Sequence, residues 1–126
     1  MSDMGRENSY YTIEGDFAYQ WEGAGQDEQA DIERALERTT KQLYALNARD
    51  VTTLLKLDTR SFWMSVLVSA PKDQDAPEVL EHGWSLIRSA FHAANVATPG
   101  WPEAAKAELF VRMRSVEVRE RSLVPA

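Results

Sequence analysis

The chain has 126 residues, with 14 Lys and Arg, 20 Asp and Glu, two His and no Cys, and a formal net charge of −6. This length predicts a single domain, because it is too short for two independent cores. The absence of Cys excludes disulfides, thiolate metal ligands and thiol nucleophiles. The negative charge argues against nucleic-acid binding over the chain as a whole. The polar start and the short apolar runs predict a cytoplasmic protein with neither a secretory signal nor a membrane span.

The N-terminal part of the chain predicts a tail, a long strand and a helix. Residues 1–8 are expected to be a flexible polar tail, with one α+β domain over 9–126. From Tyr10 to Trp21 the aromatic and apolar residues occupy every second position, which predicts a strand with one buried face. A hairpin turning at Gly15 is the alternative, and it would give a five-stranded sheet. From Asp27 to Asn47 the apolar spacing changes to three and four, which predicts a helix.

The C-terminal part predicts a hairpin, a second helix and a last strand. Two β-rich runs, Val51–Asp58 and Phe62–Ser69, are joined by a short polar link and indicate a hairpin. Pro77 is typical of a first helical turn, and a helical apolar stripe continues to Asn95. A short helical turn is expected over Pro102–Ala107, followed by an extended segment over Leu109–Leu123.

The alternation of this last segment changes phase along its length. Apolar residues occupy the odd positions as far as Met113, and the even positions from Val116 to Val118. A β-bulge near Arg114 and Ser115 explains the change, since a bulge inserts one extra residue into a strand. The alternative is a strand buried on different faces at its two ends.

The order of the elements predicts the fold. Strand, helix, strand, strand, helix, strand, with right-handed crossovers, places both helices on one face of a four-stranded antiparallel sheet. We therefore expect a ferredoxin-like βαββαβ plait of the α+β class, with extended first and last strands. The other face of the sheet is expected to be open.

The strand residues out of phase with the core define an expected interaction surface on that open face. Such an apolar set is too large for an ordinary monomer surface, so a partner should cover it. If the phase of one strand is misjudged, some of these residues face the helices instead, because a slip of one residue turns every side chain over. The expected surface consists of Leu54, Trp63, Leu67, Phe110, Arg112, Arg114, Val116 and Val118.

The residues that could perform chemistry are few. His82 and His92 are ten helical positions apart, which separates them by about 15 Å along the axis, so they cannot share a metal. Both are expected to be exposed to solvent. Asp73, Asp75 and Glu78 lack the spacing of an EF-hand loop and are expected to be solvated. With no Walker A, G-x-S-x-G or H-E-x-x-H motif, the sequence predicts no catalytic residue, metal or cofactor.

These observations favour a non-catalytic protein-interaction module that forms a homodimer or serves a partner as an accessory protein. The Ala- and Arg-rich helices are typical of a high-GC bacterium or its phage. Nucleic acid is a poor partner even for the arginine-rich last strand, because Glu117 and Glu120 interleave its arginines. No membrane partner is expected.

Two alternatives remain open. The fold plan resembles that of the antibiotic-biosynthesis-type monooxygenases, which hold substrates between helices and sheet, although none of their functional residues is matched. That resemblance implies a small-molecule-binding protein or a cofactor-independent enzyme, with Tyr19, Trp63 and Trp84 as the possible ligand pocket. The second alternative is an acidic inhibitor protein of phage or mobile-element origin.

Overall fold

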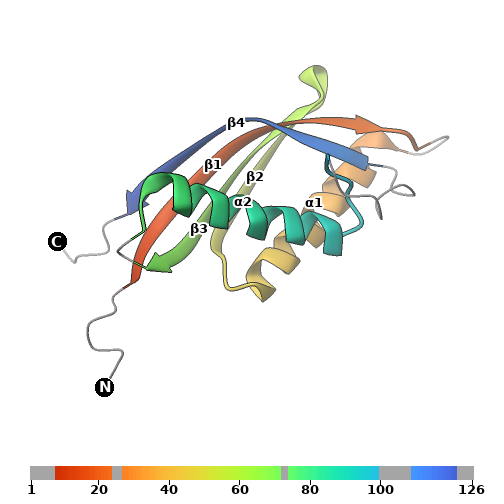
Figure 1. Ribbon diagram of the computed structural model, residues 1–126. Coiled ribbons are helices and arrows are strands. Elements are labelled where there is room, and N and C mark those ends of the chain that lie inside the picture. The colour runs from red at the N-terminus through yellow and green to blue at the C-terminus, as the bar shows by residue number, and fades with distance from the viewer. Residues whose placement is uncertain (1–7, 24–26, 72–73, 100–108, 122–126) are drawn as a thin grey trace.

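The computed structural model describes residues 8–23, 27–71, 74–99 and 109–121. Four antiparallel strands form one sheet in the order β2-β3-β1-β4, and both helices lie against the same face of it (Figure 1). The expected ferredoxin-like plait is confirmed. Of the expected tail over residues 1–8, residues 1–7 fall outside the described residues and Asn8 is the first residue of β1. The expected helical turn over 102–107 also falls outside the described residues. The elements are β1 (Asn8–Trp21), α1 (Glu28–Ala45), β2 (Arg49–Lys56), a 3-10 turn (Leu57–Thr59), β3 (Ser61–Pro71), α2 (Ala76–Ala93) and β4 (Leu109–Arg121).

Strand β1 runs without a turn through the centre of the sheet. It pairs with β3 from Asn8 to Ala18 and with β4 from Tyr10 to Trp21. The hairpin at Gly15, and the five-stranded sheet that would follow from it, are therefore excluded. The unbroken period-two alternation reflects one continuous buried face.

A β-bulge divides β4. Asp16 of β1 pairs with Ser115, while the next residue, Phe17, pairs with Met113. Arg114 is therefore the extra residue, and the predicted bulge near Arg114 and Ser115 is confirmed. The sheet has a second irregularity in β2, whose register with β3 shifts after Arg49.

The bulge determines which way the second half of β4 faces. Val116 lies opposite Gly15, and Val118 lies opposite Ile13, whose side chain is buried beneath the helices. Both valines pack against the core. The expectation that Val116 and Val118 lie on the open face is wrong, because one extra residue inverts the alternation after it.

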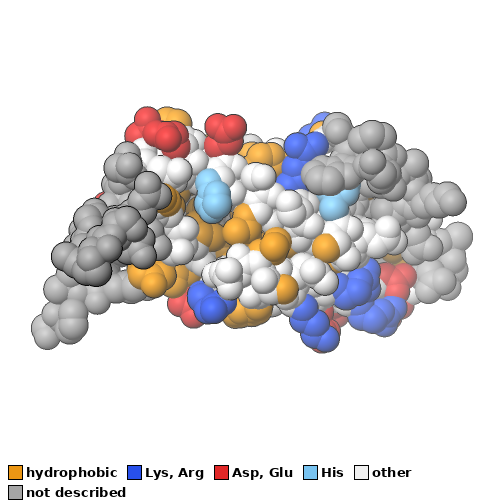
Figure 2. All heavy atoms as spheres, turned by 60° about the horizontal axis from the view of Figure 1, so that its bottom comes forward, with side chains coloured by type: hydrophobic (Ala, Val, Ile, Leu, Met, Phe, Trp, Pro, Cys, Tyr) orange, Lys and Arg blue, Asp and Glu red, His pale blue; other side chains and the backbone are white. Residues whose placement is uncertain are grey.

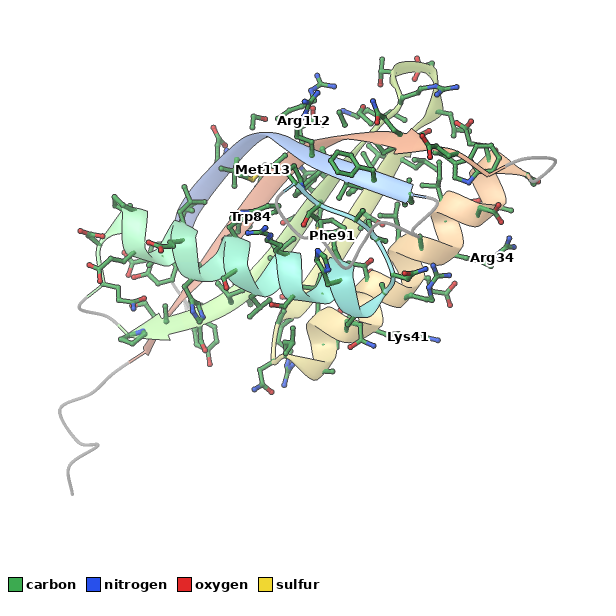
Figure 3. The ribbon with its side chains drawn as sticks, turned by 45° about the vertical axis from the view of Figure 1, so that its right-hand side comes forward. Arg34, Lys41, Trp84, Phe91, Arg112 and Met113 are labelled. Carbon is green, nitrogen blue, oxygen red and sulfur yellow. The ribbon has the colours of Figure 1, made fainter. Side chains whose placement is uncertain are left out.

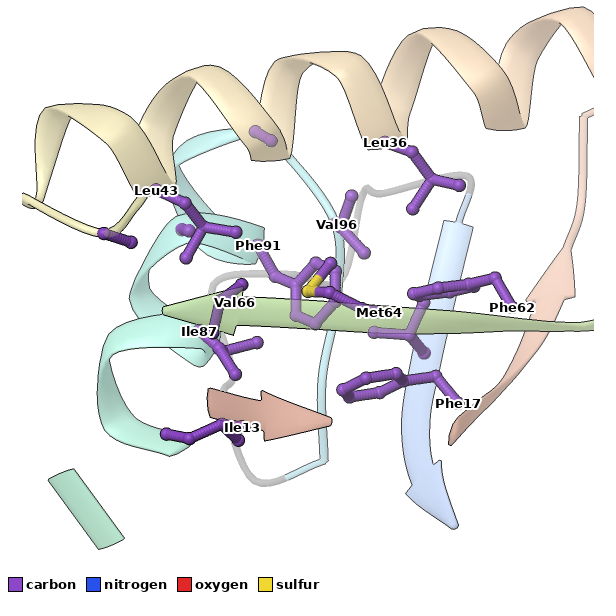
Figure 4. Close-up of a cluster of buried hydrophobic side chains, with 14 of the residues drawn as sticks. Ile13, Phe17, Leu36, Leu43, Phe62, Met64, Val66, Ile87, Phe91 and Val96 are labelled. Atoms are coloured by element: carbon purple, nitrogen blue, oxygen red, sulfur yellow. The ribbon is translucent and has the colours of Figure 1, made fainter. Parts of the chain in front are cut away.

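The core lies between the sheet and the two helices, and its centre is aromatic (Figure 4). Phe17 of β1 and Phe62 of β3 stack with ring centroids 5.1 Å apart. Phe91 of α2 approaches both rings edge-on, with centroids 5.6 and 6.1 Å away. Offset-stacked and edge-to-face pairs of this kind stabilise a core beyond the apolar area that they bury.

Helix α2 lies close to β1 at Gly83. A Cβ atom at this position would stand 1.8 Å from Cδ1 of Ile13. Only glycine allows the helix backbone to approach the sheet this closely without moving Ile13. The contact therefore sets the distance between α2 and the centre of the sheet.

Both helices begin with an aspartate cap. The Asp27 side chain accepts a hydrogen bond from the backbone N–H of Ala30, and the Asp75 side chain accepts one from Glu78. The Glu78 carboxylate in turn accepts a hydrogen bond from the backbone N–H of Asp75, which completes a capping box. Asp75 and Glu78 are therefore bound to the helix terminus, whereas Asp73 lies outside the described residues.

Candidate functional site

The open face of the sheet, which neither α1 nor α2 covers, is the candidate interaction surface. Strand alternation and the pairing registers determine its members. The open face comprises Tyr10, Thr12, Glu14, Asp16, Ala18 and Gln20 of β1, Arg49, Thr52, Leu54 and Lys56 of β2, Ser61, Trp63, Ser65, Leu67 and Ser69 of β3, and Phe110, Arg112, Ser115, Glu117 and Arg119 of β4. The ion pair with Asp16 places the bulge residue Arg114 on the same face.

The apolar part of the open face is smaller than expected and is concentrated on β2 and β3, at one edge of the sheet. Leu54 is 56% exposed and pairs directly with the half-buried Trp63. Phe110 is half-buried towards one end of the sheet. Leu67 lies on the same face but is only 9% exposed. The main contribution that apolar contact could make here therefore comes from Leu54 and Trp63.

Charged side chains are arranged in rows across the open face. Glu14 pairs with Glu117 and forms an acidic row. Lys56 and Arg112 form a basic row. They are the two ends of one line of paired residues across the sheet, Lys56, Ser61, Ala18 and Arg112. This line crosses β1 at Ala18, four residues after Glu14. Figure 3 shows Arg112 pointing away from the helices, while its neighbour Met113 points towards them.

Between these rows, the bulge residue of β4 forms an ion pair across the sheet. Arg114 Nη2 lies 3.4 Å from Asp16 Oδ2. The second oxygen of the same carboxylate, Oδ1, is buried and has no hydrogen-bond partner. A buried acceptor without a partner is costly, so this point of the surface is suited to a further donor.

A depression of about 440 Å³ lies at the end of the open face, beside the turn between β2 and β3. Its charged members are the two exposed cations Arg60 and Arg112. The Arg60 guanidinium lies 3.8 Å from Glu28 Oε1. The lining residues are Ala18, Tyr19, Gln20, Thr59, Arg60, Phe110 and Arg112.

Tyr19 lines the depression but is occupied by a contact on the helix side. Its side chain is buried, and its hydroxyl donates a hydrogen bond of 3.1 Å to Glu28 Oε2. Burial, with a smaller effect of the Glu28 carboxylate, raises the pKa of Tyr19 to about 12. The phenol therefore stays protonated near neutral pH and is unsuited to act there as a general base.

The predicted pocket of Tyr19, Trp63 and Trp84 does not form. Tyr19 and Trp84 lie on the helix side of the sheet, and Figure 3 shows Trp84 on α2. The Trp84 ring stacks on Phe17 with ring centroids 6.2 Å apart. Trp63 projects from the opposite face of the sheet, next to Leu54. The three residues cannot line one cavity, because the sheet separates them.

The two histidines occupy separate places on the helix side (Figure 2). His82 is exposed, as expected. His92 is half-buried, with its Nε2 3.0 Å from Thr98 Oγ1, so the expectation that it is exposed is wrong. The described part of the chain contains no group of three His, Asp or Glu residues that could hold a metal.

Among the described residues of the helix side, the large exposed hydrophobics are Tyr44 and Leu46 at the C-terminal end of α1, at 43% and 41% exposure. The other hydrophobic side chains on this side appear as small areas between polar and charged ones (Figure 2). Within the described ranges, no helix is long and apolar enough to cross a membrane. Leu54 of the open face is more exposed than either residue and pairs with a tryptophan, so the open face is the better candidate for association.

Sequence reasoning missed a second cavity, which we call the corner cavity. It lies on the helix side, between α1 and the corner of the sheet where β1 ends and β4 begins, and it has a volume of about 240 Å³. The only signal in the sequence was a cluster of charges one turn apart on α1, which usually indicates a solvated helix face. Its lining consists of Trp21, Asp31, Arg34, Ala35, Arg38, Asn95 and Leu109.

Comparisons with known protein families, with curated proteins and with solved structures find no match. The argument for function therefore depends on the surfaces described above.

Proposed function

We propose that this protein is a non-catalytic interaction module that forms a homodimer through the open face of its sheet. The observation that carries the proposal is the exposed Leu54 of the edge strand β2 beside Trp63 of β3, on the sheet face that neither α1 nor α2 covers. Tryptophan is enriched among the residues that contribute most to binding at an interface, and apolar neighbours exclude water around it. A cytoplasmic location and an origin in a high-GC bacterium or its phage belong to the same proposal, and the cysteine-free composition supports the location.

The open face has the size that a stable dimer needs. Its four strands are 8 to 14 residues long. With strands ~4.8 Å apart and a rise of ~3.3 Å per residue, the face covers roughly 700 Å². Stable interfaces bury about 800 Å² on each partner.

The rows of charge favour one arrangement of two copies. A two-fold axis that runs across the strands, through the row of Leu54 and Trp63, reverses the order of rows in the second copy. The acidic row of each copy then lies over the basic row of the other, and Glu117 faces Arg112 of the second copy. Leu54 and Trp63 meet their own counterparts along the axis, where aromatic pairing adds to the burial of apolar area. The Asp16–Arg114 ion pair lies in the same row and meets its counterpart as a pair without net charge. Packed sheets are rotated by about 30°, which long charged side chains accommodate.

The other face-to-face arrangement, with the axis along the strands, is disfavoured. In this arrangement β2 of one copy lies over β4 of the other, and each row of side chains faces the same row of the second copy. Lys56 would then lie over Arg112 of the second copy, and Leu54 would face the polar end of its row near Arg114. Like charges brought together in an interface are unfavourable, and the two apolar centres would not meet.

The first test introduces a charge into the apolar row of the interface. Leu54→Glu is expected to convert the dimer into a monomer at tens of micromolar, measured by size-exclusion chromatography with light scattering. Leu46→Glu is the matched control, because Leu46 is 41% exposed but lies at the end of α1, away from the open face. A monomeric wild-type protein at that concentration would overturn the proposal, as would a dimer that survives Leu54→Glu.

The second test examines the arrangement of the two copies. Arg112→Glu and Glu117→Arg should each weaken the dimer, because each brings like charges together at two symmetric positions. The double variant should restore association, since the two charges are exchanged. Loss of association that is additive in the double variant would exclude the axis across the strands.

A further inference from the structure

The depression at the end of the open face is lined by accessible side chains of that face. Gln20 of β1 pairs with Phe110 of β4, and Ala18 pairs with Arg112. Strand alternation places all four side chains on the open face, and all four residues line the depression. Gln20 and Arg112 are exposed and Phe110 is half-buried, so a molecule in the depression can contact their side chains.

The turn between β2 and β3 borders the depression on the side away from β4. The backbone N–H of Tyr19 donates a hydrogen bond of 3.0 Å to the carbonyl of Arg60, which holds this turn against β1. Thr59 is exposed, and its Oγ1 lies 2.8 Å from Oγ of Ser61, a residue of the open face. Thr59 therefore brings a hydroxyl group to this rim of the depression.

Arg112 is the cation that can serve a ligand here. The guanidinium of Arg60 is directed to Glu28 of α1, 3.8 Å away. Within the described part of the chain, Arg112 has no ion-pair partner, so its N–H donors are open to a ligand. No carboxylate is among the described residues that line the depression. A planar guanidinium in this setting favours a carboxylate or phosphate, which accepts two parallel hydrogen bonds from it.

Phe110 and Gln20 are suited to a planar group beside the anion. An aromatic ring of a ligand packs on a phenylalanine ring by offset stacking or edge-to-face contact. The Gln20 amide carries both a donor and an acceptor for polar atoms at the edge of such a ring. The volume of about 440 Å³ lies within the range of about 300–1,000 Å³ that small-molecule sites occupy.

From these contacts we propose that the depression binds a small aromatic acid, a molecule that joins a planar ring to a carboxylate or phosphate group. The acidic group accepts hydrogen bonds from the Arg112 guanidinium. The ring packs on Phe110, while Gln20 and Thr59 bond polar atoms at its edge.

The charges of the neighbouring residues restrict the ligand to a small molecule. The acidic row of Glu14 and Glu117 crosses the open face beyond Arg112. A nucleic-acid strand that continued from Arg112 along β4 would bring its phosphates onto this row, which is unfavourable. A single anionic group at the depression does not reach it.

The same arginine takes part in the proposed dimer, where it faces Glu117 of the second copy. A bound acid and the second copy therefore compete for Arg112, and the ligand should shift the dimer towards the monomer. This consequence rests on the proposed dimer, whereas the binding site itself does not.

The binding experiment compares probes that carry both groups with matched probes that carry one. Indoleacetate and adenosine monophosphate carry a ring and an acid, acetate and inorganic phosphate lack the ring, and tryptophol and adenosine lack the acid. Calorimetric titration uses the full chain with Leu54→Glu, in which no second copy is expected to cover Arg112. At least one two-group probe should bind at least about tenfold more tightly than both of its single-group counterparts. If neither binds at millimolar concentration, or if a single-group counterpart binds equally well, the proposal is overturned.

Two substitutions in the same background locate the site. Arg112→Gln removes the cation and should weaken the two-group probe at least about tenfold. Phe110→Leu keeps an apolar side chain but removes the ring, and should weaken the probe about three- to tenfold. Arg119→Gln is the matched control, because Arg119 is exposed on the same face of β4 but lies outside the depression. Melting temperatures show that each variant is folded, and binding that is insensitive to both Arg112→Gln and Phe110→Leu would overturn the proposal.

Light scattering on the wild-type protein distinguishes failure of the site from failure of the dimer. A saturating two-group probe should shift the dimer towards the monomer. A wild-type monomer that binds the probe would overturn the dimer and support the site, while a dimer whose Leu54→Glu variant binds no probe would overturn the site alone. A dimer that stays intact at saturation would overturn the competition for Arg112.

Discussion

The two faces of the sheet are built from alternate residues of the same strands, yet they have opposite character. The helix-covered face buries a continuous aromatic and aliphatic layer around Phe17 and Phe62. The open face carries rows of charge beside a small apolar row at Leu54 and Trp63. The contrast shows that strand alternation identifies the buried face where a strand is regular, while the chemistry of the other face has to be worked out pair by pair.

The largest expected effect on stability comes from truncating Phe62, and its neighbour Trp63, which points to the opposite face, provides the comparison. Phe62→Ala should lower the free energy of unfolding by about 3–5 kcal/mol, because it leaves a cavity in the aromatic centre. Trp63→Ala should cost about 1–2 kcal/mol, measured on the monomer, because this side chain is only half-buried. Urea unfolding of both variants makes the comparison, and equal losses would contradict the assignment of faces.

Deleting single residues of β4 should separate the role of the bulge from that of the strand. Removing Arg114 leaves a regular ladder with Val116 and Val118 still facing the helices, so we expect a loss of about 1 kcal/mol or less. Removing Glu117 forces Val116 or Val118 out of the core, at a cost of about 2 kcal/mol. If denaturant unfolding ranks the two deletions in the reverse order, the extra residue is not Arg114.

At the contact between α2 and β1, the effects of substituting Gly83 and Ile13 on the free energy of unfolding should be coupled. Gly83→Ala gains about 1 kcal/mol of helix propensity, but its methyl group collides with Cδ1 of Ile13, and such overpacking costs about 1–3 kcal/mol. We expect a net loss in the wild-type background.

In the Ile13→Val background the colliding atom is gone, so the same Gly83→Ala change should be neutral or stabilising. A double-mutant cycle from thermal unfolding measures this coupling. Independent effects of the two changes would show that α2 does not lie as close to β1 as described.

The smallest effect concerns Tyr19 at the junction of the two faces. Its pKa is raised to about 12, so the folded state favours the neutral phenol. The corresponding stability is complete below pH 10 and is lost as the pH rises from 10 through 12. Absorbance at 295 nm should show one tyrosine that ionises about two pH units above the ordinary value of 10. This high-pH transition should be absent in Tyr19→Phe. Titration of every tyrosine near pH 10 would contradict the buried contact with Glu28.

The plait could be predicted from the sequence because its signals are local. Alternation over Tyr10–Trp21 and the helical spacing around Leu36 and Phe91 each depend on neighbours along the chain. The orientation of Val116 and Val118 was predicted wrongly, although the bulge itself was recognised. The face on which a residue lies after a bulge depends on its pairing with the neighbouring strand. The sequence of β4 alone does not show how it pairs with β1.

The candidate sites were less accessible to sequence reasoning for the same physical reason. Trp63 and Trp84 are both aromatic and both follow the expected periodicity, but the sheet lies between them. The corner cavity joins Trp21, Asp31 and Asn95 from three elements, and no spacing along the chain predicts that they meet. Unpartnered polar atoms become visible only once packing is known.

The irregularities in the two outer strands have a consequence for how the molecule can assemble. β2 and β4 form the edges of the sheet, and each has a register shift within its length. A bulge twists an edge and interrupts the row of backbone groups that another chain would extend. Strand-by-strand growth into fibrils is therefore disfavoured at both edges of the sheet. The proposed dimer is a closed, self-limiting contact between faces and uses neither edge.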